Sequence, residues 1–318
     1  MSRIRLSVLD LVPLIGTEDA AAALGEAVKL AQAAEKLGYA RYWLAEHHDM
    51  QSVVSSSPEV LLAHVGARTE QIRLGSGAVL LPYYKPYKVA ESFHMLASLY
   101  PGRIDLGIGR APGGSAHVSL ALGDNFLEGV RRMPESLEAL TALLADDYRI
   151  EGEKVSARPL PPIPPELWLL GTNEKSAQFA SRFSAGYVFG HFMSDQDGPA
   201  IVQRYREDYR ASGRDTEPKV IVAVRAVCAE TEEKAAAYAE QGLKQLFGTS
   251  GGGPAVQQPF PGRALVGSPE GVAAKLSELS ELYETDEFMI VTLAPTYEAR
   301  IRSYELLADK LRIGTKEE

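Results

Sequence analysis

Short apolar runs alternate with longer amphipathic segments along almost the whole chain. A continuous apolar run of about four to eight residues is typical of a strand buried on both faces, and apolar residues spaced three and four apart are typical of a helix. The apolar runs predict strands at residues 4–10, 42–45, 72–81, 103–109, 167–170, 187–189, 220–229 and 287–292. The amphipathic segments predict helices at residues 20–37, 58–69, 87–99, 126–144, 174–183, 196–212, 232–247, 269–282 and 297–311.

Eight predicted strands, each followed by a helix, indicate an α/β fold of the (β/α)8 barrel type, with a doubly wound open sheet as the alternative. A single barrel commonly takes roughly 250 residues or more, so we expect one domain over residues 1–318. Two segments are then insertions in loops. A hairpin with a proline-rich link occupies about 146–165, and a segment rich in Gly, Pro and Gln occupies about 248–265.

Composition narrows the expected partners. The chain is 45% hydrophobic and carries a net charge of −9 without a basic cluster, which argues against nucleic acid and anionic membrane surfaces. No apolar run approaches the roughly 20 residues that cross a bilayer. Cys228 is the one cysteine, so an intrachain disulfide is excluded and a reducing compartment is favoured. We therefore expect a cytoplasmic protein.

Candidate chemistry lies at the carboxyl ends of the strands, which gather at one face of a barrel. Asp10 ends the first predicted strand, and Glu46-His47-His48 follows the second. Successive side chains of a strand point to opposite faces, so we expect only one of the two histidines to face the site. Histidine exchanges a proton near neutral pH, which makes it a candidate for acid–base chemistry. A pair of hydrogen-bonded rim histidines is the structural alternative.

Glycine precedes a polar side chain at two further strand ends, where it permits close approach of a ligand. Gly109 is followed by Arg110, whose guanidinium could hold a phosphate or, alternatively, form an ion pair at the rim. Gly190 is followed by His191, which could contact the edge of a planar ligand or belong to the core.

A third strand end runs directly into a helix. Gly171-Thr172-Asn173 leads to Ser176 in the first turn of the helix predicted at 174–183. Free backbone amides at a helix start bind anions, and the Thr172 and Ser176 hydroxyls add donors. An ordinary helix cap formed by Thr172 or Asn173 is compatible with the same residues. Together with Arg110, this turn indicates a phosphorylated cofactor.

Other kinds of site lack their motifs. Gly107-Ile-Gly109-Arg-Ala-Pro112 has proline where a dinucleotide-binding loop requires its third glycine, so that loop is rejected. The sequence has no HExxH, no His-x-His and no tight acidic cluster, and we therefore expect no metal site. A Gly-x-Ser-x-Gly elbow for a serine hydrolase is also missing.

Four segments together resemble the bacterial luciferase-like flavin monooxygenase family. They are LAEHH at 44–48, GSGAVLLP at 75–82, PGRIDLGIGRAPG at 101–113 and LLGT at 169–172. The second and third are the most specific, and the similarity covers essentially the whole chain. Within the family, the chain is most similar to single-chain, alkanal-monooxygenase-like members rather than to the light-emitting heterodimer.

The resemblance implies FMN as the cofactor, used in its reduced form and delivered by a separate flavin reductase. His47 corresponds to the catalytic histidine of the family. Ala78 corresponds to the residue beneath the flavin ring, and the Gly77–Ala78 bond to a non-proline cis peptide. Arg110, Thr172 and Ser176 fall in the phosphate site.

Two glycines depart from the luciferase pattern. Gly109 stands where the light-emitting subunit has a reactive cysteine, and Gly171 stands where it has an acidic residue, which puts light emission in doubt. A homodimer is also implied by the resemblance. The expected activity is oxidation by O2 of a small organic substrate such as an aldehyde, with residues 248–261 as a lid. An F420-dependent hydride-transfer enzyme on the same fold and a non-catalytic flavin-binding protein are the alternatives.

Overall fold

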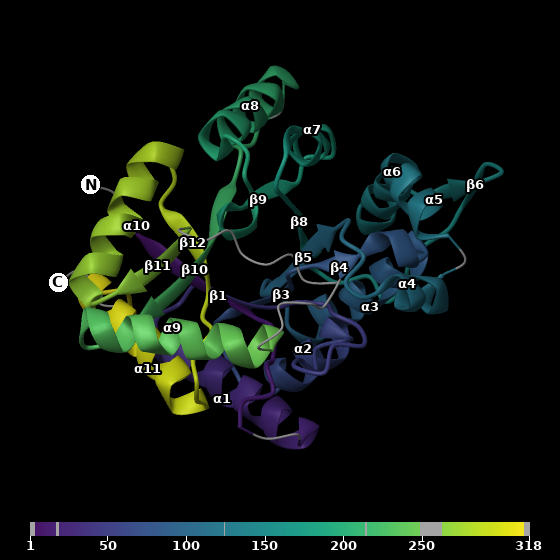
Figure 1. Ribbon diagram of the computed structural model, residues 1–318. Coiled ribbons are helices and arrows are strands. Elements are labelled where there is room, and N and C mark those ends of the chain that lie inside the picture. Colours follow the sequence, from purple (N-terminus) through teal and green to yellow (C-terminus); the bar gives the residue numbers. More distant parts are fainter. Residues whose placement is uncertain (1–3, 17–18, 124, 214, 249–262, 315–318) are drawn as a thin grey trace.

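Eight parallel strands close into a barrel within the residues that the computed structural model describes, which are 4–16, 19–123, 125–213, 215–248 and 263–314. The strands pair in the order β1, β2, β3, β5, β8, β9, β10, β12, and β12 pairs again with β1. Their bounds are Arg5–Asp10, Arg41–Leu44, Arg73–Ser76, Ile104–Gly109, Glu166–Gly171, Gly186–Gly190, Val220–Cys228 and Glu287–Val291. The predicted (β/α)8 barrel is confirmed (Figure 1).

Helices cover the outside of the barrel. Neighbouring helices pack in the order α1, α2, α3, α6 and then α7, α8, α10, α11, and α11 returns to α1 (Figure 1). Their bounds are Ala20–Leu37, Pro58–Gly66, Pro86–Leu99, Met133–Leu144, Glu174–Arg182, Gly198–Ala211, Pro269–Tyr283 and Tyr297–Leu311. The helix α9 (Glu232–Phe247) packs on β10 and on the short strand β11 (Ala264–Gly267).

The core has two layers, because successive side chains of each strand point to opposite faces. One layer lies between strands and helices. The other layer fills the barrel and is here called the interior cluster. Its buried members are Leu9, Trp43, Ala45, Val53, Trp168, Val188, Ile221, Ala223, Leu246, Met289, Val291 and Leu293. The two indole rings are fully buried and meet edge to face with centroids 5.8 Å apart. The barrel is therefore a packed core rather than a pore.

The third predicted strand, residues 72–81, is interrupted in the structure. The strand β3 ends at Ser76, the Gly77–Ala78 peptide bond is cis as expected, and the chain resumes as β4 (Val79–Leu80), which pairs with β5. The strand β11 was not predicted; it pairs with the carboxyl half of β10. The predicted lid at 248–261 falls almost entirely on residues 249–262, which lie outside the described part of the chain.

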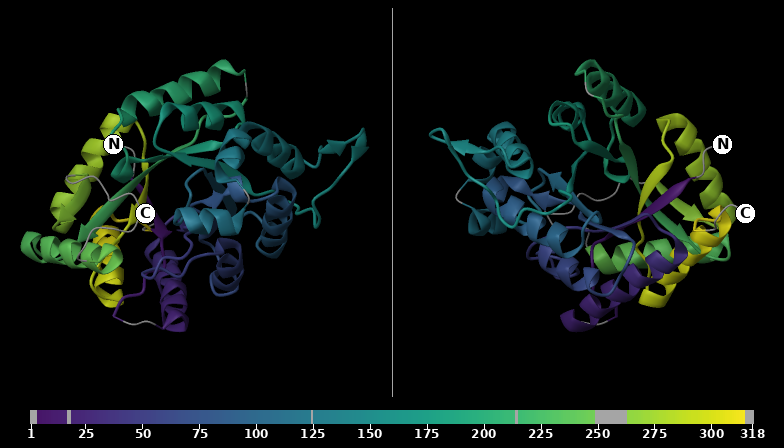
Figure 2. Two further views of the ribbon diagram at one scale, coloured as in Figure 1. Left: turned by 45° about the vertical axis from the view of Figure 1, so that its right-hand side comes forward. Right: turned by 180° about the vertical axis from the view of Figure 1, so that it is seen from behind.

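The segment after β5 also differs from the prediction. A short helix α4 (Ala116–Leu122) was missed, and the helix predicted at 126–144 is two helices, α5 (Phe126–Arg131) and α6. Pro134 lies in the first turn of α6, where its missing amide costs nothing, so it starts a helix instead of continuing one. The predicted hairpin is present as β6 (Arg149–Ile150) and β7 (Glu153–Lys154), which extend away from the barrel (Figure 2).

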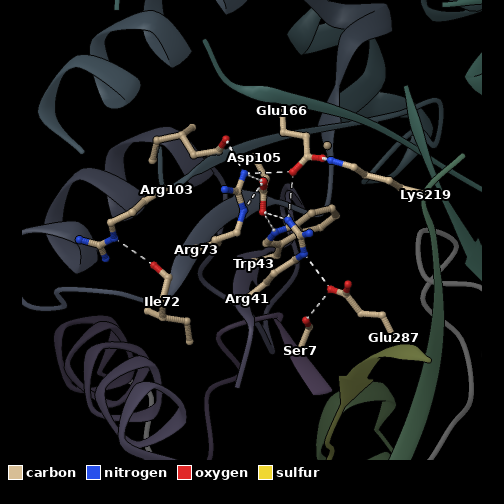
Figure 3. A network of polar contacts seen from close by, with 12 residues as sticks. Ser7, Arg41, Trp43, Ile72, Arg73, Arg103, Asp105, Glu166, Lys219 and Glu287 are labelled. Atoms are coloured by element: carbon tan, nitrogen blue, oxygen red, sulfur yellow. Dashed lines mark hydrogen bonds and ion pairs between the residues drawn. The ribbon is translucent and has the colours of Figure 1, made fainter. Parts of the chain in front are cut away.

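A buried network of charges closes the amino-terminal end of the barrel (Figure 3). Asp105 is fully buried and accepts hydrogen bonds from Arg41 Nη1 at 2.7 Å, Trp43 Nε1 at 2.9 Å and Arg73 Nε at 3.0 Å. Arg41 also donates to Glu287 Oε1 at 2.7 Å. Each buried charge therefore has an opposite charge beside it, which is the condition for burying ions without a large penalty.

Candidate active site

The alternation of β2 decides which of the two histidines faces the barrel. Trp43 and Ala45 belong to the interior cluster. Continuing the alternation beyond the strand end places His47 on this same side, and Glu46 and His48 on the other. The side chains of Trp43 and Ala45 thus indicate His47, rather than His48, as the histidine on the interior side.

Glu46 fastens the end of β2 to β4. Its side chain is 3% exposed, and its Oε1 accepts hydrogen bonds from the Tyr84 hydroxyl at 2.7 Å and from His48 Nε2 at 2.8 Å. Its Oε2 accepts from the Leu80 amide at 3.0 Å. His48 is thus engaged in a structural contact. The sequence indicated a cluster here but not that Glu46 and His48 would serve the fold.

His47 has a buried ring nitrogen without a hydrogen-bond partner. This nitrogen is Nδ1, and the backbone amide of His47 donates to the Ser55 carbonyl at 2.9 Å. Burial lowers the pKa of His47 to about 4, although the nearby Glu46 carboxylate acts in the opposite direction. The imidazole is therefore neutral at pH 7. A buried polar atom without a partner in the free protein is one that a ligand can satisfy.

Glycines bring β5 against the cis peptide of the neighbouring strand. A Cβ on Gly107 would lie 2.1 Å from the Ser76 carbonyl oxygen, and a Cβ on Gly109 would lie 3.0 Å from the Cβ of Ala78. The Ser76 hydroxyl donates to the Gly107 carbonyl at 2.9 Å. Ala78, the residue after Gly77 in the cis bond, is buried. Close packing of small residues leaves a surface lined by backbone, which suits a planar ligand.

Arg110 lies beside the start of α7. Its Nη2 donates to Asn173 Oδ1 at 3.2 Å, and its guanidinium stacks over Phe179 at 5.6 Å from the ring centroid. No described carboxylate forms an ion pair with Arg110, so the ion-paired rim arginine that the sequence left open is not observed. Burial lowers the pKa of Arg110, and arginine nevertheless stays protonated. Its remaining donors are available for an anion.

The start of α7 is capped by Asn173. Its Oδ1 accepts from the Ser176 amide at 3.2 Å, and the Ser176 hydroxyl donates to the Asn173 carbonyl at 2.6 Å and lies 3.0 Å from the Tyr187 hydroxyl. The cap interpretation is therefore correct for Asn173 and not for Thr172, and Ser176 completes the cap. The amides of Glu174 and Lys175 have no hydrogen-bond acceptor among the described residues, so the cap leaves two donors for an anion.

The ends of β8 and β9 meet beside this cap. A Cβ on Gly171 would lie 2.1 Å from Ser176 Oγ, and a Cβ on Gly190 would lie 3.3 Å from Thr172 Cγ2. The Thr172 carbonyl accepts from the Ser194 hydroxyl at 2.9 Å. These contacts explain why both strands end in glycine. They also gather most of the predicted phosphate-site residues around one helix start.

Comparison with known proteins identifies the family. Residues 4–285 match a family described as luciferase-like monooxygenase. The chain belongs to this family. The N-acetyl-S-alkylcysteine monooxygenase of Bacillus subtilis is 37% identical over 331 residues, which cover 96% of this chain and 98% of that protein. A crystal structure of apo-MsnO8 is 33% identical, has a TM-score of 0.85 and covers 98% of this chain and 100% of its own. Luciferase-like monooxygenases are oxidoreductases, and so is this protein.

More distant structures share the luciferase-like fold with two different cofactors. The oxygenating constituent of 3,6-diketocamphane monooxygenase from Pseudomonas putida, in complex with FMN, has a TM-score of 0.73 at 20% identity and covers 97% of this chain and 98% of its own. An F420-dependent secondary alcohol dehydrogenase has a TM-score of 0.72 at 14% identity and covers 98% of this chain and 99% of its own. At these identities, the likeness concerns the fold alone.

Two strand-end candidates face the helices rather than the barrel. His191 Nδ1 lies 2.9 Å from the Tyr283 hydroxyl of α10, and the two rings meet edge to face. Asp10 accepts hydrogen bonds from Arg300 at 2.7 Å and from the Tyr42 hydroxyl at 2.6 Å. Both side chains are engaged in contacts between strands and helices. This placement favours the core role that the sequence left open for His191, and it gives Asp10 a structural role.

A cavity of about 790 Å³ opens at the opposite, amino-terminal end of the barrel. It is lined by the starts of β1, β2, β10 and β12, and by residues of α8 and α10. Barrel enzymes place their chemistry at the carboxyl ends of the strands, where His47 lies. Arg41 and Glu287 in its wall belong to the buried network already described. We therefore assign this cavity to the structural end of the barrel.

The described part of the chain has neither a metal-binding cluster nor a membrane-spanning helix. No three or more His, Cys, Asp and Glu side chains there come together in a way that could hold a metal ion. No helix there is long and apolar enough to cross a membrane.

Proposed function

We propose that the protein is an FMN-dependent monooxygenase that oxidises a small organic substrate with O2. The observation that carries the proposal is the pairing of Arg110 with the start of α7. Arg110 has no described carboxylate partner and donates from Nη2 to Oδ1 of the capping Asn173 at 3.2 Å. Beside it are two backbone amides that have no acceptor among the described residues. Such a combination of positive charge and helix amides is suited to a phosphate.

The remaining residues fit a flavin. Arg110, Thr172 and the amides of Glu174 and Lys175 would hold its phosphate. The close-packed surface of Gly109 and Ala78 would lie beneath its ring. Bound reduced FMN would supply the activation of O2 and the transfer of one oxygen atom, chemistry that no amino-acid side chain provides.

His47 would act beside the flavin through its unused nitrogen. With a pKa of about 4, His47 is a weak base at pH 7. Its principal contribution would therefore be a hydrogen bond at Nδ1 rather than removal of a proton from the ligand. The carboxylate of Glu46 holds β2 and β4 together and so fixes where this imidazole lies. The apolar interior cluster beneath the site limits the access of water from below.

An F420-dependent enzyme is the second candidate, since a protein of that kind has the same fold. The long acidic tail of F420 requires several cations beyond a single phosphate site. At the start of α7, Arg110 and Lys175 supply two, and both lie against Phe179. FMN, whose phosphate is its one charged group outside the ring system, is the better match.

For the substrate, an aldehyde remains the first expectation. The relative at 37% identity is named for N-acetyl-S-alkylcysteines, which are carboxylic acids with a thioether sulfur, and these are the second class to test. We further propose that a separate reductase delivers the reduced flavin, that two copies form a homodimer, and that the protein works in the cytoplasm.

The cofactor is tested by anaerobic equilibrium titration of the protein with reduced FMN, reduced riboflavin and reduced F420. The proposal predicts the tightest binding for FMN, with riboflavin weaker because it lacks the phosphate. Tighter binding of F420 than of FMN would indicate an F420-dependent hydride-transfer enzyme instead. Equal binding of FMN and riboflavin would show that the phosphate site is misplaced.

A further inference from the structure

The strand β10 carries one charged residue, Arg225, in an otherwise apolar run. Ile221 and Ala223 belong to the interior cluster, and Val222 and Val224 pack against the helices. The alternation of the strand therefore puts Arg225 on the interior face of the barrel.

Arg225 lies toward the carboxyl end of the barrel. In the register of the sheet, Ala223 is opposite Gly190, the last residue of β9, and Arg225 is opposite Val291, the last residue of β12. Arg225 is thus one pleat beyond Gly190, at the end where His47 and the start of α7 lie. This is the end of the barrel at which (β/α)8 enzymes bind their substrates.

The guanidinium of Arg225 is buried without a counter-charge. Arg225 is 7% exposed, and its Nη1 has no hydrogen-bond partner. No described carboxylate forms an ion pair with its guanidinium. Two other buried arginines, Arg41 and Arg300, each have a carboxylate oxygen at 2.7 Å. An unpaired buried charge is costly to the fold, so its presence points to a partner that is not part of the chain.

The interior face of the barrel next to Arg225 is apolar. Val291, its register partner on β12, and Ala223, one pleat back on β10, are buried members of the interior cluster. A ligand that satisfies this environment has an apolar body and one anionic group. A planar carboxylate matches the two parallel donors of a guanidinium.

We propose that Arg225 binds a carboxylate of the substrate, so that the enzyme acts on small organic acids with an apolar chain. The identity of this ligand as the substrate rests on the proposed function. The binding site itself does not. In the sheet, β9 separates β10, which carries Arg225, from β8, whose end leads into the phosphate site.

The first test measures what Arg225 does for the free protein. We compare urea midpoints of wild type, Arg225→Met and Arg206→Met, in the full chain without ligand. Arg206 is a matched control, because it is also buried but donates to the Glu284 carbonyl at 2.7 Å. The expected result is a midpoint for Arg225→Met at or above that of wild type, and a lower midpoint for Arg206→Met. A loss for Arg225→Met as large as that of the control would make Arg225 a structural residue and overturn the proposal.

The second test measures ligand binding by isothermal titration with octanoate and with octanamide, its neutral counterpart of equal length. Wild type is expected to bind octanoate about tenfold or more tightly than octanamide, since a charge-assisted pair is made only by the acid. The Arg225→Met variant should lose this preference, and Arg206→Met should keep it. Equal affinities for the two compounds in wild type, or a preference that survives Arg225→Met, would overturn the proposal.

A parallel FMN titration separates this inference from the proposed function. If FMN binds and the octanoate preference is missing, the carboxylate site fails and the flavin function stands. If the octanoate preference is present and FMN does not bind, the carboxylate site stands and the flavin function fails. If Arg225→Met weakens FMN more than riboflavin while the octanoate preference is unchanged, Arg225 belongs to the cofactor site and the proposal is wrong.

Discussion

Replacement of Arg110 by methionine tests the phosphate site with little disturbance of the fold. Methionine keeps the length of the apolar stem and its contact with Phe179, and it removes the charge and the donors. No described carboxylate depends on Arg110; its one described hydrogen bond is the donation to Asn173 at 3.2 Å. The cap of α7 itself is formed by Asn173 and Ser176 and remains intact. We therefore expect the free energy of unfolding to change by less than about 1 kcal/mol.

The expected loss in cofactor affinity follows from the chemistry of the pair. A hydrogen bond to a charged group contributes about 1.5–3 kcal/mol, and Arg110 is half-buried, so about 2 kcal/mol is a suitable value. This corresponds to a dissociation constant for FMN that rises about 30-fold. The affinity for riboflavin, which has no phosphate, should stay within about twofold, so the ratio of the two constants isolates the phosphate contact.

Anaerobic titration with reduced FMN and reduced riboflavin, followed by absorbance, supplies both constants. Lys175→Met is the matched control: this lysine is exposed in the first turn of α7 and lies over the same Phe179 ring. Screened by water, it should change FMN affinity by only a few fold. The reasoning fails if Arg110→Met weakens FMN and riboflavin equally, or if Lys175→Met weakens FMN as much as Arg110→Met does.

Three further variants test the fold and the site. Asp105→Asn should lower the free energy of unfolding by about 3–5 kcal/mol in urea titrations, because two arginines lose their buried carboxylate; a loss below about 1 kcal/mol would contradict the role of the network. Stability should fall as pH drops from about 6.5 to about 4, since His47 takes up a proton at higher pH when unfolded than when folded. His47→Gln should remove up to about 2–3 kcal/mol of that fall, and an unchanged pH profile would refute the burial of this imidazole. Gly107→Ala should cost about 1–3 kcal/mol of stability and weaken FMN binding, because the added Cβ meets the Ser76 carbonyl. The control Gly25→Ala in α1 places its Cβ in open space and should stabilise the protein slightly. Calorimetric midpoints that rank the two variants the other way would contradict the packing.

Much of the barrel could be predicted from the sequence, because strands buried on both faces appear as uninterrupted apolar runs. The exceptions have physical causes. The apolar pattern of 72–81 gives no sign of the break after Ser76, and the cis bond at Gly77–Ala78 was expected from the family resemblance alone. The strand β11 has only four residues beside a Gly- and Pro-rich segment. The division of the helix predicted at 126–144 could have been foreseen, since Pro134 is compatible with a helix start and not with its interior.

The candidate site was less accessible to sequence reasoning than the fold. Alternation indicated that only one of two adjacent histidines would face the barrel, and β2 sets which one. What the sequence could not provide were contacts across the sheet, such as the bond from Glu46 to the Leu80 amide. Arg225 is not among the predicted site residues, because a single charge does not interrupt the apolar pattern of a core strand. The sequence does carry a signal, since a buried arginine among valines and alanines needs either a counter-charge or a ligand.

The central claim is that the site binds reduced flavin and uses it to activate oxygen. It is tested most directly by loading the protein with reduced FMN without oxygen, mixing it rapidly with oxygenated buffer, and recording absorbance spectra with and without octanoate present. The account predicts a spectrum that belongs to neither reduced nor oxidised FMN and that persists long enough to be resolved from both. Immediate conversion to oxidised FMN, with an equal amount of hydrogen peroxide released under both conditions, would contradict it.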